Sequence, residues 1–159
     1  MKKLLLIPLC FSLFFTSCSD DEEEEVIPPV SVLDADMRGE WTNTSIKRTY
    51  YNFGDEVMYE DSVLRNANFR FDGKRMTVTL PGSAEKDVWN YEFPNNTDST
   101  YIQLHQDTTS TDYTVTSISD TVMIWEDEIR WAGFPEDVPD DQKTTSRYGV
   151  YKWKFVRKK

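Results

Sequence analysis

The chain has 159 residues, the usual length of one domain. Its 18 basic and 28 acidic residues give a formal net charge of −10, and a chain this acidic lacks the clustered Lys and Arg that bind nucleic-acid backbones. A single His and two Cys exclude a His-rich or Cys-rich metal site, while an aromatic content of 14% excludes a disordered chain. We therefore expect a folded domain with no nucleic-acid partner, no metal and no cofactor.

The first 17 residues have the layout of a secretory signal. Lys2 and Lys3 precede an apolar run over residues 4–15, which is shorter than the ~20 residues that a membrane-spanning helix needs. The small residues and cysteine that follow, Thr16-Ser17-Cys18, resemble the lipobox of bacterial lipoproteins. That resemblance implies a signal peptide over residues 1–17 and an acylated Cys18 that anchors the protein in the outer-membrane bilayer. The alternative is an ordinary signal that is cleaved elsewhere.

A run of six acidic residues, 20–25, begins one serine after Cys18. Its like charges repel one another and stay solvated, which is typical of a flexible spacer. An acidic run in this position also resembles the surface-export signal of Bacteroidetes-type lipoproteins. The resemblance implies display on the cell surface, with the periplasmic face as the alternative. We expect residues 18–32 to be a disordered acidic tether that contains two prolines, and residues 33–159 to be the folded domain.

From about Leu33 the chain alternates apolar and polar residues with the period of two that is typical of strands. The clearest case is a hairpin of residues 67–72 and 75–80, joined at Asp72-Gly73. Further strands are expected over residues 40–51, 57–64, 87–93, 100–106, 112–117, 121–126, 129–131 and 147–156, with a turn at 126–128 and a loop at 134–146. This spacing predicts an all-β sandwich or barrel, and we favour an antiparallel up-and-down β-barrel of 8–10 strands because a barrel has no exposed edges.

Two short motifs connect this pattern to a known family. Gly39-Glu40-Trp41 matches the Gly-x-Trp signature at the start of the first lipocalin strand, and Thr111-Asp112-Tyr113 matches the later Thr-Asp-Tyr triplet in the same chain order. The domain therefore resembles the small lipocalin-like (calycin-like) domains of secreted bacterial lipoproteins. In that family the Trp closes the barrel base and a late Arg packs on it, which implies these roles for Gly39, Trp41 and Arg157. The chain lacks the long helix and the disulfide of larger lipocalins.

A barrel of this kind either holds one small ligand or is filled by its own side chains. The expected inward side chains are the candidate ligand contacts, although most large aromatic residues serve only as core. These candidates are Phe69, Phe71, Trp89, Tyr91, Ile102, Leu104, Ile124 and Trp153. They would suit a small hydrophobic ligand or the face of a sugar. Trp125 and Trp131 flank the expected acidic turn and are assigned to the barrel mouth or to an exposed contact patch.

The sequence carries no recognisable catalytic pattern. It has no Gly-x-Ser-x-Gly motif and no phosphate-binding glycine loop, and His105 alternates with Leu104 so that it should face solvent. Acidic residues in turns are ordinarily solvated, which leaves a carboxylate-based hydrolase as a minor alternative. We therefore expect a non-catalytic protein that binds a small hydrophobic or carbohydrate ligand. The main alternative is a surface interaction module with a filled barrel that docks a partner protein in an envelope complex.

A final pattern concerns modification. Asp-Ser or Asp-Thr followed by an apolar residue or Thr occurs four times, and this triplet resembles the O-glycosylation signal of Bacteroidetes-type exported proteins. The resemblance implies glycan attachment at Ser62, Ser99, Thr108 and Thr121. The alternative is a Thr-rich β protein with Asp in its turns.

Overall fold

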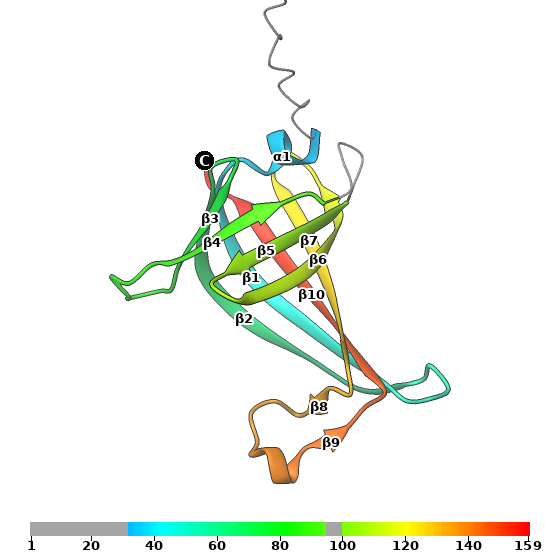
Figure 1. Cartoon of the computed structure of the whole chain (residues 1–159). Coiled ribbons are helices and arrows are strands. Elements are labelled where there is room, and N and C mark those ends of the chain that lie inside the picture. The colour runs from blue at the N-terminus through cyan, green and yellow to red at the C-terminus, as the bar shows by residue number, and fades with distance from the viewer. Residues whose placement is uncertain (1–31, 95–99) are drawn as a thin grey trace, which may run out of the picture.

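Eight antiparallel strands form a closed barrel in the computed structural model, which describes residues 32–94 and 100–159 (Figure 1). The order around the barrel is β1-β10-β7-β6-β5-β4-β3-β2, so almost every strand pairs with its neighbour in sequence. The strands are β1 (Gly39–Tyr51), β2 (Val57–Phe71), β3 (Arg75–Thr79), β4 (Asp87–Glu92), β5 (Tyr101–Gln106), β6 (Thr109–Ile118), β7 (Val122–Arg130) and β10 (Tyr148–Arg157). The predicted all-β, up-and-down barrel is confirmed. The expected signal peptide, Cys18 and the tether up to residue 31 lie outside the described residues.

The barrel closes where the first strand pairs with the last. β1 and β10 run antiparallel from Trp41 opposite Arg157 to Tyr51 opposite Tyr148. Alternation in each strand sends one set of side chains inward, and these form an aromatic core in which Phe155 contacts Phe69 and Trp125 at ring-centroid distances of 5.0 and 4.9 Å. The hairpin predicted at Asp72-Gly73 is confirmed, with Phe71 opposite Met76.

Two predicted boundaries are wrong. Residues 57–64 and 67–71 are parts of one strand, β2, which pairs with β1 on both sides of a register shift between Asn43 and Ser45, where Arg65 and Asn66 have no partner in β1. Residues 126–128 are not a turn but lie within β7, which pairs with β10 over its whole length. The acidic residues there fit a strand because Glu126 lies on the outer face and forms an ion pair with Lys152 at 2.7 Å.

A short helix, α1 (Val32–Met37), covers one end of the barrel (Figure 1). Its Asp34 is buried and accepts a hydrogen bond of 2.7 Å from the Tyr91 hydroxyl. That hydroxyl in turn accepts the backbone N–H of Gly73 at 2.8 Å. The Met37 carbonyl accepts the indole N–H of Trp41 at 2.7 Å. These bonds fix the helix over the aromatic core and close this end.

The opposite end is built differently. Strands β1, β2, β7 and β10 extend past the other four, and the chain between β7 and β10 lies across this extension (Figure 1). This connecting segment, residues 131–146, includes the loop expected at residues 134–146, but it contains β8 (Gly133–Phe134), η1 (Asp140–Gln142) and β9 (Thr144–Thr145), with β8 and β9 paired. Phe134 packs on Tyr50 at a ring-centroid distance of 5.0 Å and forms a second small core. None of the described helices is long and apolar enough to cross a bilayer.

Candidate functional site

A cavity of about 260 Å³ lies inside the barrel. All eight barrel strands contribute to its wall, and the wall is mainly aromatic and aliphatic. The aromatic residues of the wall are Phe69, Trp89, Tyr113, Trp125, Trp153 and Phe155. Pockets for drug-sized ligands measure ~300–1,000 Å³, so this cavity fits a somewhat smaller molecule.

Two tryptophans give the apolar wall a polar character. Trp125 and Trp153 are opposite each other on β7 and β10, and both line the cavity. Their indole N–H groups are buried and have no hydrogen-bond partner among the described residues. A buried donor without a partner loses its hydration without compensation. An acceptor oxygen on a bound molecule would remove this cost.

Charged residues of both signs stand at the rim of the cavity. Arg65 and Asp87 both belong to its lining. Arg65 also lines a smaller adjoining hollow of about 110 Å³, together with Arg48 and Tyr151. Since Arg only donates hydrogen bonds and a carboxylate only accepts them, the rim offers both kinds of contact to a polar group on a ligand.

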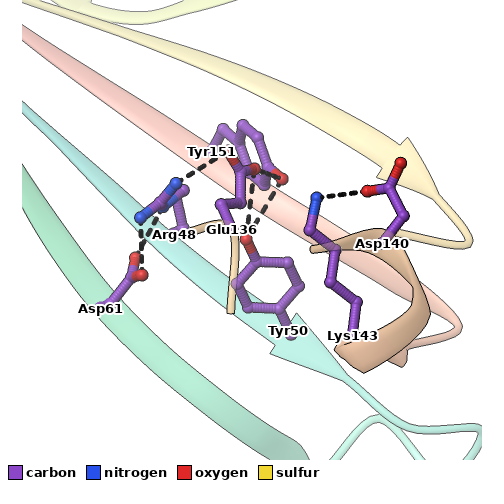
Figure 2. Close-up of polar contacts among 7 residues, drawn as sticks. All are labelled: Arg48, Tyr50, Asp61, Glu136, Asp140, Lys143 and Tyr151. Atoms are coloured by element: carbon purple, nitrogen blue, oxygen red, sulfur yellow. Dashed lines mark hydrogen bonds and ion pairs between the residues drawn. The ribbon is translucent and has the colours of Figure 1, made fainter. Parts of the chain in front are cut away.

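The adjoining hollow is bordered by a cluster of five side chains, the Glu136 cluster, which consists of Arg48, Tyr50, Asp61, Glu136 and Tyr151 (Figure 2). The Arg48 guanidinium lies between two carboxylates, with Nη2 at 2.6 Å from Asp61 and Nη1 at 2.8 Å from Glu136. The Tyr151 hydroxyl donates to Glu136, and the Tyr50 hydroxyl lies 3.2 Å from that of Tyr151. Glu136 belongs to the connecting segment, so the cluster joins that segment to β1, β2 and β10.

The electrostatics of the Glu136 cluster favour a structural role. Burial raises the pKa of Tyr151, and the hydrogen bond to Glu136 raises it further. Burial by itself lowers the pKa of Arg48, but its bond to Asp61 and the charge of Glu136 outweigh this effect and raise it. Both groups therefore keep their protons across the physiological range. Proton transfer near neutral pH needs a group with a pKa near 7, and neither residue supplies one.

Half of the predicted ligand contacts line the cavity, namely Phe69, Trp89, Leu104 and Trp153. Three others are buried but are not part of the lining, namely Phe71, Tyr91 and Ile102. The prediction that Ile124 points inward is wrong. Its neighbours Met123 and Trp125 are the buried residues of β7, so alternation turns Ile124 to the outer face.

The two tryptophans assigned to the mouth or to an exposed patch have opposite environments. Trp125 is buried in the aromatic core, so that prediction is wrong for it, because the expected turn beside it is a continuous strand. Trp131 is 61% exposed, as predicted.

The predicted base of the barrel is confirmed in its geometry. The Arg157 guanidinium carbon lies 4.2 Å from the centroid of the Trp41 ring. Arg157 also donates hydrogen bonds to the Arg38 and Asp36 carbonyls at the end of α1. Gly39 has a φ of +117°, and a Cβ there would lie 3.2 Å from the Arg157 guanidinium. Glycine at this position therefore permits both the backbone turn and the close approach of the arginine.

His105 and the glycosylation-like triplets lie on the surface or outside the described residues. The His105 side chain is 37% exposed, and its Nε2 lies 3.2 Å from Glu92. Ser62, Thr108 and Thr121 are exposed, with Thr108 in the turn between β5 and β6. Ser99 lies outside the described residues. Among residues 32–94 and 100–159, no group of three or more His, Cys, Asp or Glu is arranged to hold a metal ion.

One acidic residue of β7 has an unusual environment. Asp127 is partly buried, and this burial, together with the charges of Asp112 and Glu128, raises the pKa of its carboxyl. A carboxyl whose pKa is higher in the folded than in the unfolded state binds more protons when folded. The free energy of unfolding therefore falls as the pH rises from about 4, the unfolded pKa, through the folded pKa, and the penalty persists at neutral pH.

Asp127→Asn is expected to remove this penalty. The variant should have a higher Tm than the parent protein at pH 7, and the difference should shrink toward zero as the pH falls below about 4. Thermal unfolding followed by circular dichroism between pH 3 and 8 measures this. Asp120→Asn is the control, because Asp120 is an exposed residue of the turn between β6 and β7 and its charge is not among those that raise the pKa of Asp127, so no gain is expected. Equal Tm values for parent and Asp127→Asn at pH 7 would contradict the prediction.

Sequence reasoning missed Arg48, Arg65 and Asn43. All three are polar residues of β1 or β2. Asn43 and Arg65 line the cavity, and Arg48 belongs to the Glu136 cluster. Asn43 is buried and donates a hydrogen bond of 3.0 Å to the Lys154 carbonyl. A polar residue in an inward position is the signal that could have identified Asn43 and Arg65.

No family model matches the chain, and neither the curated proteins nor the solved structures contain a significant match.

Proposed function

We propose that this protein is a lipid-anchored, surface-exposed envelope protein that binds one small hydrophobic or carbohydrate ligand inside its lipocalin-like barrel, without catalysis. The observation that carries this proposal is the cavity of about 260 Å³ with its wall of aromatic residues. A concave, mainly apolar space with a few polar groups is typical of sites for small molecules. The anchor rests on the resemblance of Thr16-Ser17-Cys18 to a lipobox and on the acidic run that follows.

The cavity also supports one of the two functions that the sequence left open. A module that only docks a partner protein has no use for an interior space, and such a space costs packing energy. The unpartnered indole N–H groups of Trp125 and Trp153 add to that cost unless a ligand accepts them. These two features favour ligand binding over a filled barrel.

Native mass spectrometry of the full chain, purified in mild detergent from its own host, tests both parts of the proposal. We expect an added mass that survives denaturation, from acylation at Cys18, and a second added mass that denaturation removes, from the ligand in the cavity. A chain that carries no lipid mass would contradict the anchor. A chain that carries no removable mass would contradict ligand binding.

A cavity-filling variant locates the ligand. Ala67 is buried and lines the cavity, so Ala67→Leu places a larger side chain in that space. We expect the removable mass to be lost and the Tm to stay the same or rise, since filling a cavity adds contacts. Ala84→Leu makes the same change at an exposed loop residue and should retain the ligand. Retention of the ligand by Ala67→Leu would exclude the barrel cavity as its site.

A further inference from the structure

A second pocket lies outside the barrel. The elements that line it meet at the end of the long strands that is farthest from α1, as Figure 1 shows. The pocket has a volume of about 380 Å³ and is formed by the loop between β1 and β2, the end of β7 and the start of β10. Two large aromatic side chains stand in it exposed to solvent, with Phe53 at 73% and Trp131 at 61% exposure. Their ring centroids lie 5.7 Å apart.

Trp131 is unfavourable for the fold in two ways. Its backbone has a φ of +57°, in the left-handed region that bulky residues rarely adopt. Its large indole is mostly in water, where it gains little from burial. Asn or Gly would suit this backbone better. A strained residue with an exposed aromatic side chain points to a role in binding.

The pocket is held in shape without a ligand. The Asn52 side-chain oxygen accepts the backbone N–H groups of Gly54 and Glu56 at 2.8 and 3.0 Å, which fixes the loop between β1 and β2. Arg147 then forms an ion pair with Asp55 in this loop at 2.9 Å. These bonds hold Phe53 in position beside Trp131, so a ligand would not have to order the aromatic pair.

The charged residues of the pocket indicate the kind of ligand. Arg130 and Arg147 supply only donors, Asp55 and Glu128 supply only acceptors, and the four charges sum to zero. Arg130 and Glu128 form no ion pair with any residue of the described chain, so both are available to a ligand. A sugar ring presents C–H bonds on one face and hydroxyl groups that both donate and accept at its edge. The exposed rings fit that face, and the paired charges fit the hydroxyl groups.

We propose that the pocket formed by Phe53, Trp131, Arg130, Glu128, Asp55 and Arg147 is a binding site for a neutral saccharide. It is separate from the barrel cavity and does not depend on the function proposed for that cavity. A neutral ligand is favoured over an anionic or cationic one because the charges of the pocket balance. A saccharide is favoured over a protein surface because the pocket is concave and more polar than apolar, while a stable protein interface takes ~800 Å² from each partner.

This site can be tested by titrating the purified protein with cellohexaose, xylohexaose and mannohexaose. Binding is measured by calorimetry and by tryptophan fluorescence. At least one of these neutral hexasaccharides is expected to bind. In the variant Trp131→Asn its affinity should fall at least tenfold, while the Tm stays the same or rises because Asn tolerates the left-handed backbone. A residue with only a structural role would show the opposite pattern, with a lower Tm.

Two control variants distinguish this pocket from the barrel cavity and from other exposed apolar side chains. Leu64→Ala removes another exposed apolar side chain, far from the pocket, and should bind as the parent does. Ala67→Leu fills the barrel cavity and should also bind as the parent does. The proposal is overturned if none of the three sugars binds at about 10 mM, if Trp131→Asn binds as the parent does, or if Ala67→Leu abolishes binding. Retention of a host protein by the parent but not by Trp131→Asn, with no response to any sugar, would instead identify a protein-docking surface.

Discussion

Trp41→Ala is expected to lower the free energy of unfolding by about 3–5 kcal/mol, the range for truncating a large buried aromatic residue. Trp41 is fully buried at the end of the barrel that α1 covers. Its ring faces the Arg157 guanidinium, and its indole N–H donates a hydrogen bond to the carbonyl of Met37, the last residue of α1. Truncation would leave a void in the core, release α1 and remove the surface on which Arg157 packs. Urea denaturation measures the change in stability.

The variants Trp41→Phe and Arg157→Met separate these contributions. Trp41→Phe keeps most of the apolar volume and should lose less than half as much stability as Trp41→Ala. Arg157→Met keeps the aliphatic stem but loses the cation–π contact, worth about 0.5–2 kcal/mol, together with its hydrogen bonds to the end of α1. A loss below about 1 kcal/mol for Trp41→Ala would contradict the assigned role of Trp41.

Arg48→Met is expected to cost about 3 kcal/mol, near the lower end of the range for breaking a buried ion pair. The Arg48 side chain is 11% exposed, and its removal would leave the carboxylates of Asp61 and Glu136 without their common counter-charge. The cost stays at the lower end because Glu136 is 37% exposed and can recover part of its hydration. Urea denaturation gives the cost, and hydrogen exchange should show faster exchange in the connecting segment, residues 131–146.

The chain offers a matched surface pair as the control. Lys152 and Glu126 form an ion pair of 2.7 Å on the outer face of the barrel, with the Lys152 side chain 48% exposed. Lys152→Met should therefore cost no more than about 1 kcal/mol and leave exchange in residues 131–146 unchanged. Equal losses for Arg48→Met and Lys152→Met would mean that the Glu136 cluster contributes no more than a surface pair.

The barrel could be predicted from the sequence because the patterns that indicate its strands and turns are local. Alternation along each strand and the Asp72-Gly73 turn follow from side-chain period and backbone preference, and both act over a few residues. The contact between Arg157 and Trp41 joins residues that are far apart in the sequence, and only a family resemblance indicates it. Residues alone give no reason to pair those two positions.

The inward-facing residues of β1 could not be predicted, because a bulge shifts the inward side chains from odd to even positions. Trp41 and Asn43 point inward at odd positions, but after the bulge between Asn43 and Ser45 the inward residues are Ile46, Arg48 and Tyr50. Strict alternation from Trp41 therefore assigns Arg48 to the solvent side, which conceals the Glu136 cluster. A bulge depends on pairing with a partner strand, which a single stretch of sequence does not reveal.

The error at β7 has a different cause. Three consecutive acidic residues, 126–128, indicate a solvated turn by composition, but composition does not show what a partner strand provides. In the barrel, β10 supplies backbone bonds along the whole stretch, and Lys152 supplies a counter-charge to Glu126. The tertiary partner overrides local preference here, and the same override places Trp125 in the core.

The pairing of β1 with β10 has a consequence for how the chain reaches its native state. Partners such as Trp41 and Arg157 are separated by more than one hundred residues, and β1 keeps one open edge until β10 arrives. All-β barrels fold slowly, on the scale of milliseconds to seconds, because the entropic cost of closing a loop comes before the stabilising contacts between distant strands can form. During synthesis, all the earlier strands emerge before the ring can be completed. The hairpins can form early, but the cavity exists only after the final strand has been added.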